Sequence, residues 1–257
     1  QGIEQERYLT ITIERKNFDE AKAQFATIEA SMFRSFAELG SKLTPLTGNE
    51  RLKILHDYYR LGREDEFNFD IRKGKITGTD FRNEICNTRI KYHPDYFEDE
   101  GKVGRILFIK KYPTYLSDRF FTELTFLPVH SVTSVDVVPV PKDLTMKMLQ
   151  KKYLGIESDI IKQQRTRNRN NDFSSDISYA TRQKKKDIEE IMNNVRENDE
   201  SLYYVSVTMI VMADNRDELE SICETVDSIA KGAGCAVDTC MYKQREAVNT
   251  TLPIGVR

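Results

Sequence analysis

The spacing of apolar residues near the start of the chain predicts a strand and then a long helix. Residues 7–14 alternate polar side chains with three apolar ones, Leu9, Ile11 and Ile13, which is the period of a half-buried strand. From Phe18 to Leu39 apolar side chains recur every three or four residues, and Gly40 follows. This pattern is typical of an amphipathic helix that ends at a glycine.

The next segment carries the signals of a second helix. Thr47 and Glu50 have the spacing of a capping box, in which each side chain accepts a hydrogen bond from the other residue's backbone N–H. We expect the helix that they open to end at Gly62. Residues 63–80 are polar, contain two glycines and show no period, so we predict a loop or an internal domain boundary there. Together these elements form a predicted β-α-α unit over residues 1–80.

Farther along the chain, two segments each predict a strand, a helix and a second strand. In the first segment these are Val103–Tyr112, a short helix within Thr114–Phe126, and Ser131–Val140. In the second they are Tyr203–Met212, a helix capped at Asp214 or Asn215 that ends at Gly232, and Cys235–Tyr242. The sequence therefore predicts two β-α-β units.

Between the two units lies a longer stretch of helical pattern, residues 141–198. Its first half repeats apolar side chains three and four residues apart, at Met146, Leu149, Tyr153, Ile156 and Ile160. Its second half repeats that spacing at Ile177, Thr181, Lys184, Ile188, Ile191 and Val195. The polar residues 163–172 separate the halves, so we expect two helices packed as an antiparallel hairpin along this seam.

These elements predict an α+β fold. Two β-α-β units that share one sheet make a ferredoxin-like arrangement. We place it at residues 81–243, with the long helical hairpin at 141–198 inserted into it. Residues 244–257 are rich in Asn, Thr, Pro and Gly, which is typical of a connection between ordered elements, so we predict a linker there.

Composition agrees with a folded, soluble domain. The 257 residues are 39% hydrophobic and 31% charged, and no apolar run approaches the roughly 18 residues of a membrane-spanning helix. The first residues lack the features of a secretory signal. Four cysteines and three histidines show no metal-binding spacing, so we expect reduced thiols and neither a metal nor another cofactor.

No pattern in the sequence indicates a catalytic site. The glycine-containing segments 72–80 and 230–238 lack the spacing of a phosphate-binding loop, and the second is better explained as a helix end plus a turn. The acidic clusters at 64–66 and 98–100 have no glycine-punctuated ligand loop, so we interpret them as solvated charges. His93 has no nucleophile at a recognised spacing. We expect this chain neither to bind nor to hydrolyse ATP.

Charge is unevenly distributed, although the net charge is only −2. Residues 161–186 hold eight basic side chains against Asp172 and Asp176, a local excess of six positive charges. The eight are Lys162, Arg165, Arg167, Arg169, Arg182, Lys184, Lys185 and Lys186. At the tip of the predicted hairpin such a cluster is either simply solvated, or contacts an anionic partner or lipid, or contacts nucleic-acid phosphate.

Several strings resemble the N-terminal domain of the TraC/TrsE-like (VirB-type) ATPases of type IV secretion and conjugative transfer. They are residues 7–60, VGRILFIKKYPTYLSDRFFTEL and QREAVNTTLPIG. The resemblance extends from Arg7 to Gly255. It implies that the ATPase motor, with its nucleotide-binding motifs, would lie beyond Arg257 and that this part is not itself an enzyme.

The resemblance also implies a docking role in the secretion channel of a mobile genetic element. Such a domain would be cytoplasmic and peripheral at the inner face of the bacterial membrane, where it would attach the motor domain to inner-membrane channel components. Homo-oligomers would be possible in the full-length protein. The basic cluster is then the candidate contact for a partner or anionic lipid. The alternative is a nucleic-acid-binding module of a mobile element that uses the same cluster.

Overall fold

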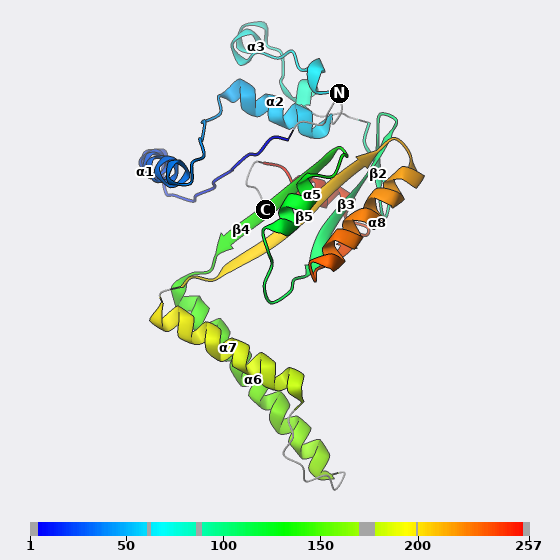
Figure 1. Ribbon diagram of the computed structural model, residues 1–257. Helices are drawn as coiled ribbons and strands as arrows, with labels where there is room; N and C mark the ends of the chain where they lie inside the picture. Colours follow the sequence, from blue (N-terminus) through cyan, green and yellow to red (C-terminus); the bar gives the residue numbers. More distant parts are fainter. Residues whose placement is uncertain (1–4, 61–62, 86–88, 170–177, 199, 254–257) are drawn as a thin grey trace. The chain divides into compact units, whose positions relative to one another are not determined.

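The computed structural model describes residues 5–60, 63–85, 89–169, 178–198 and 200–253 (Figure 1). Helices predominate, and the strands form one antiparallel sheet, so the predicted α+β class is confirmed. The chain divides into two compact units, which we describe separately. The first comprises Gln1–Ser134 with Val207–Arg257, and the second comprises Val135–Ser206.

The predicted long helix is present as α1 (Phe18–Glu38). It begins after Asn17, whose side-chain oxygen accepts a hydrogen bond from the Glu20 N–H at 2.9 Å. Gly40 follows the helix with a φ of 71°, a left-handed conformation that favours glycine. The sequence therefore located both ends of this helix.

The predicted capping box is also present, at the start of α2 (Gly48–Tyr59). The Glu50 carboxylate accepts from the Thr47 N–H at 2.6 Å, and the Thr47 hydroxyl oxygen accepts from the Glu50 N–H at 3.3 Å. These bonds satisfy two N–H groups that a helix start otherwise leaves unpaired. The predicted end at Gly62 lies outside the described residues.

The predicted strand over residues 7–14 is wrong. This segment has no ladder partner among the described residues, and Leu9 and Ile11 are exposed. Alternating apolar and polar residues give a segment the two faces of a strand. A strand also needs a neighbouring strand whose backbone N–H and C=O groups pair with its own.

The predicted loop over residues 63–80 is wrong as well. It contains the 3-10 helix η1 (Glu64–Glu66) and helix α3 (Ile71–Thr77), and α4 (Arg82–Ile85) follows. Asp70 caps α3 by accepting from two backbone N–H groups, and Gly78 ends it in the left-handed region. Helices this short have too few turns to show an apolar period, so their caps were the only available signal.

The six strands of the sheet are β1 (Lys91–Tyr92), β2 (Phe97–Asp99), β3 (Lys102–Lys111), β4 (Ser131–Pro139), β5 (Tyr203–Ala213) and β6 (Ala236–Thr239). They lie in the order β1-β2-β3-β5-β4, and β6 also pairs with β3. On one edge β3 pairs antiparallel with β5, which sets Ile106 opposite Ile210. On its other edge β3 pairs first with β2 and then with β6.

Helices α5 (Arg119–Thr125) and α8 (Arg216–Gly232) complete the two predicted β-α-β units. Their four strands lie in the order β6-β3-β5-β4, which is the order of the ferredoxin-like split β-α-β arrangement. Two details differ from expectation. Strand β6 is shorter, and the left-handed glycine after α8 is Gly234, with a φ of 74°, because Gly232 is still helical.

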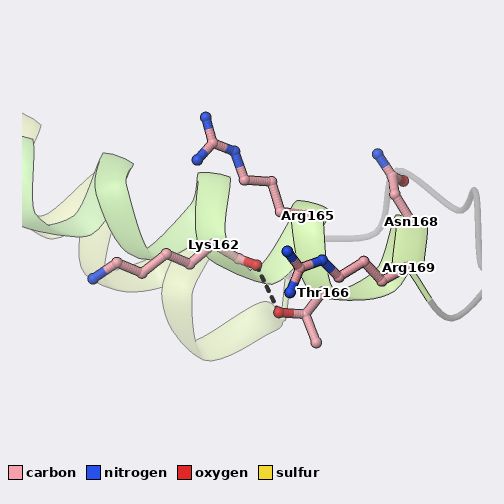
Figure 2. Close-up of a pocket in the computed structure, with 5 residues that line it drawn as sticks. All are labelled: Lys162, Arg165, Thr166, Asn168 and Arg169. Carbon is pink, nitrogen blue, oxygen red and sulfur yellow. Dashed lines mark hydrogen bonds between the residues drawn. The ribbon is translucent and has the colours of Figure 1, made fainter.

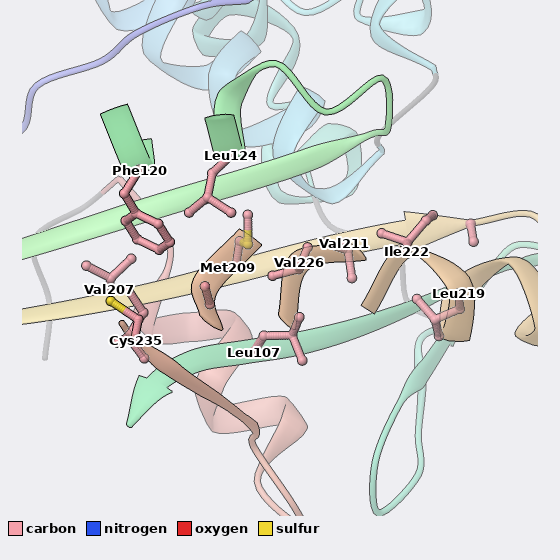
Figure 3. Close-up of a cluster of buried hydrophobic side chains, with 13 residues drawn as sticks. Leu107, Phe120, Leu124, Val207, Met209, Val211, Leu219, Ile222, Val226 and Cys235 are labelled. Carbon is pink, nitrogen blue, oxygen red and sulfur yellow. The ribbon is translucent and has the colours of Figure 1, made fainter. Parts of the chain in front are cut away.

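One face of the sheet carries the larger apolar core (Figure 3). Leu219 and Val226 of α8 and Phe120 of α5 pack there against strand residues that include Leu107 and Val211. Leu219 and Val211 are completely buried, at 0% exposure. Helix α8 therefore covers this face of the sheet with its buried apolar side chains.

The other face of the sheet is covered by a helix near the C-terminal end of the chain. Helix α9 (Gln244–Thr250) buries Gln244, Ala247 and Val248, and the Gln244 side chain accepts a hydrogen bond from the Ile106 N–H at 3.1 Å. The Tyr58 hydroxyl donates to the Val248 carbonyl at 2.7 Å. The predicted linker over residues 244–257 is therefore wrong for residues 244–250, which form a helix in the core, and residues 254–257 lie outside the described part.

The second unit contains the predicted antiparallel hairpin of α6 (Lys142–Arg169) and α7 (Tyr179–Glu197). Its direction follows from two contacts between the helices. Gln163 lies within 3.5 Å of the Thr181 hydroxyl, whereas Glu157, earlier in α6, lies 3.1 Å from Lys185, later in α7.

The seam of the hairpin is as predicted on α6 and shifted on α7. All five predicted α6 residues are buried or half-buried. On α7, Lys184 and Ile191 are exposed, and Lys185 and Met192 take their places, while Ile177 lies outside the described residues. At each of these two positions the candidates were neighbours of the same polarity, Lys184 or Lys185 and Ile191 or Met192. Hydrophobicity therefore could not show which of the two faces the seam.

Candidate electrostatic docking site

The basic cluster begins on a helix rather than on a connecting loop. Helix α6 continues to Arg169, so the three arginines Arg165, Arg167 and Arg169 occupy its last two turns. The expectation of a polar connection over residues 163–172 is therefore wrong up to Arg169, and residues 170–177 lie outside the described part. A helix fixes the relative positions of these cations, since residues three and four apart are neighbours on its surface.

Three of the eight predicted cations line one open hollow of about 350 Å³. Lys162, Arg165 and Arg169 line it with Thr166 and Asn168 (Figure 2). The Thr166 hydroxyl donates to the Lys162 carbonyl at 3.0 Å. Figure 2 shows the three charged ends pointing in different directions, so this surface presents dispersed positive charge.

Among the described residues, the three hollow-lining cations are weakly neutralised. Lys162 has the Asp159 carboxylate at 4.0 Å, and both side chains are more than half exposed. An exposed pair at that distance contributes little, typically below about 1 kcal/mol. Arg169 lies in the last turn of α6, where the helix dipole favours positive charge. Its position therefore stabilises α6, and the weak pairing of the three cations leaves their charge available to an anion.

Lys185 has a structural role instead. Its ammonium lies 3.1 Å from the Glu157 carboxylate and 5.0 Å from the centre of the Tyr153 ring, both on α6. Hydrogen bonds with Tyr153 and Glu157 raise the pKa of Lys185, and the Lys185 ammonium lowers the pKa of Glu157. This contact joins the two helices, and its partners Tyr153 and Glu157 were not predicted from the sequence.

The other predicted cations do not line the hollow. Arg182, Lys184 and Lys186 are exposed on α7. Arg167 is half-buried and interacts with another group of the chain. The cluster that looked continuous in the sequence is thus divided into a hollow-lining group on α6, an exposed group on α7, and Arg167 and Lys185, which interact within the chain.

The remaining polar candidates have structural contacts. The His93 ring stacks on Tyr96 at 4.2 Å, and its Nε2 lies 3.2 Å from Glu98. In the acidic clusters, Glu66 lies 3.5 Å from Arg60, and Glu100 pairs with Arg63. The segment 72–80 contains most of α3. The segment 230–238 contains the end of α8 and the turn after it, as predicted, and then the start of β6.

A buried charge network around Arg105 was not anticipated from the sequence. Its guanidinium donates to both Glu220 carboxylate oxygens, at 2.7 and 2.8 Å, and to the Asp95 carbonyl and carboxylate. These bonds with Glu220 raise the pKa of Arg105 and lower that of Glu220. Arg216 also reaches Asp95, at 3.2 Å, and its guanidinium lies over the Tyr96 ring. In the sequence, this network was indicated by a single arginine, Arg105, within an apolar strand.

Metal and membrane sites can be assessed over the described part of the chain. Within it, no three His, Cys, Asp or Glu side chains are grouped closely enough to hold a metal ion. None of the helices described there combines the length and the apolar character that a membrane crossing requires. Cys223, Cys235 and Cys240 are free thiols, and burial raises the pKa of each.

Comparison with protein-family models gives no match for this chain, and comparison with curated protein sequences gives none either.

Proposed function

We propose that this chain is a docking domain that attaches through the positive charge at the end of α6. The observation that carries the proposal is the group Lys162, Arg165 and Arg169, exposed together around one open hollow. The resemblance to the type IV secretion ATPases gives the partner: inner-membrane components of a conjugative secretion channel. On this proposal the domain is cytoplasmic, peripheral at the membrane and non-catalytic, and it positions a motor domain.

Electrostatic attachment suits such a site because it does not require an apolar interface. Each basic group near an anionic membrane surface contributes about 1 kcal/mol, and the attraction decays over roughly 10 Å at 0.1 M salt. Three cations spaced along two turns of helix can therefore act together on one anionic surface. Anionic lipid next to the channel would strengthen the same attachment.

A nucleic-acid-binding module of a mobile element is the second candidate. One observation favours it: Tyr179, in the first turn of α7, is 80% exposed. An exposed aromatic ring beside positive charge is the combination with which proteins bind single-stranded nucleic acid, by stacking on a base while the cations contact phosphate.

The test compares two triple variants with the same change of charge. Lys162, Arg165 and Arg169 are replaced by Glu in the first variant, and Arg182, Lys184 and Lys186 in the second. Each variant is used as bait to recover inner-membrane channel components from cells. We expect the first variant to lose at least about 90% of the recovered partner, since three attractions become repulsions, and the second to keep most of it.

Equal recovery by the first variant and the wild type would remove the α6 cations from the docking role. Nucleic-acid binding by the same proteins is measured in parallel as salt is varied. Tight binding that weakens steeply with salt, because bound counterions are released, and that is lost in the first variant and in Tyr179→Ala would favour the second candidate.

A further inference from the structure

Helix α1 presents an apolar face that the rest of the described chain does not bury. None of its 21 residues is buried. Of the apolar residues on this face, Phe18 is 80% exposed and Phe25 is 42% exposed, while Ala21, Ile28 and Met32 are half-buried. A helix of this length is about 30 Å long, and a partly exposed apolar stripe along it is typical of an interaction surface.

The apolar side chains follow a coiled-coil spacing. Phe18, Ala21, Phe25, Ile28 and Met32 are separated by three, four, three and four residues. That repeat places them on one side of the helix, as the a and d positions of a heptad. The stripe is therefore suited to packing against another helix.

The two flanks of the stripe differ in charge. On one flank lie Lys22 and Glu29, seven residues apart and of opposite sign, and the other flank carries the neutral Gln24 and Ser31. Neither Lys22 nor Glu29 forms an ion pair with another residue in the described part of the chain. In heptad terms Lys22 and Glu29 both occupy e positions, which decide the orientation of coiled-coil partners.

We infer that α1 pairs with α1 of a second copy of this chain, as an antiparallel two-helix coiled coil. In that arrangement e positions face e positions across the two-fold axis. Lys22 of each copy then lies beside Glu29 of the other, which gives two symmetric ion pairs. The stripe is complementary as well, because the small Ala21 faces the larger Met32 and Phe25 faces Ile28.

Two other arrangements fit the same residues less well. A parallel pair would set Lys22 beside Asn17 and Glu29 beside Gln24, without an ion pair. An anionic membrane surface would face a helix with four acidic residues and two basic ones, a net charge of −2 that opposes binding. This inference concerns α1 alone and does not depend on the function proposed for α6.

The test is the mass of the full chain by sedimentation equilibrium over a wide concentration range. We expect the wild type to dimerise reversibly and Phe25→Asp to be monomeric. Lys22→Glu should raise the dimer Kd at least about tenfold, because it turns two attractions into two repulsions. The double variant Lys22→Glu with Glu29→Lys should restore the wild-type Kd. Arg34→Glu, on the opposite side of α1, is the matched control and should leave the Kd unchanged.

The charge reversals lie on the exposed helix surface. Circular dichroism should therefore show the same helical content for the charge-reversal variants as for the wild type. A monomeric wild type would overturn the inference, and so would a dimer insensitive to Phe25→Asp. Failure of the double variant to recover the affinity lost by Lys22→Glu would overturn the antiparallel pairing.

Discussion

The sheet and the helical hairpin are stabilised in different ways. The sheet has apolar cores on both faces, in which Ile106 of β3, Val211 of β5 and Leu219 of the covering helix α8 are completely buried. In the described part of the hairpin helices, Thr145 and Leu149 are the only buried residues, and the rest of the seam is half-buried. A narrow seam leaves most of each helix surface in water. The hairpin can therefore carry many charges with little effect on its stability, which a site for electrostatic docking requires.

The largest effect should come from a charge placed in the sheet. Val211→Asp puts a carboxylate at 0% exposure in the middle of β5. It would lie opposite Arg105, whose guanidinium already bonds to Glu220 and Asp95, so the buried charge costs several kcal/mol. Because typical domains are stable by about 5–15 kcal/mol, we expect the first unit to unfold or to melt far below the wild type. Differential scanning calorimetry measures this. A melting temperature close to that of the wild type would contradict the assigned core.

A charge in the hairpin seam should have a smaller and local effect. Leu149→Asp replaces a side chain that is 5% exposed and should cost about 3 kcal/mol, opening α6 from α7 while the sheet stays folded. Leu154→Asp is the control, because Leu154, on the same helix, is 63% exposed. Limited proteolysis and helical content by circular dichroism distinguish the two variants. Unchanged protease resistance in Leu149→Asp would show that the seam is wrongly assigned.

The smallest effect should distinguish two neighbouring lysines. Lys185→Ala removes the contact with Glu157 and Tyr153 and should destabilise the hairpin slightly. Lys184→Ala removes an exposed side chain and should cost less than that. Urea unfolding followed by helical content measures both. A larger loss from Lys184→Ala would restore the seam that the sequence predicted.

Elements with a strong pattern and a local cap were predictable from the sequence. Helices α1, α2 and α8 each combine an apolar period with a side chain that accepts a hydrogen bond from a backbone N–H in the first turn. Strands β3, β4 and β5 are marked by dense apolar and β-branched residues. Their order in the sheet followed from the β-α-β repeat.

Features that depend on distant partners were not predictable. Residues 7–14 have a strand pattern, but a strand forms only where another edge can pair with it. Helix α9 is polar in sequence, and its helix is held by contacts with β3 and Tyr58. The site was foreseen as a set of cations but not as separate groups, because the separation depends on which side of α6 or α7 each cation occupies.

The way the hairpin joins the sheet implies that the hairpin can be removed or replaced without changing the sheet. The Val140 N–H donates to the Leu202 carbonyl at 2.8 Å, so the two ends of the insertion are already as close as the ends of a tight turn. Helix α5 connects β3 to β4, and helix α8 connects β5 to β6. A two-residue turn in place of the hairpin would therefore still connect β4 to β5 and leave the order of the ferredoxin-like strands unchanged. The same junction would accept a hairpin of another length or charge, so the length of the proposed docking surface can change independently of the sheet.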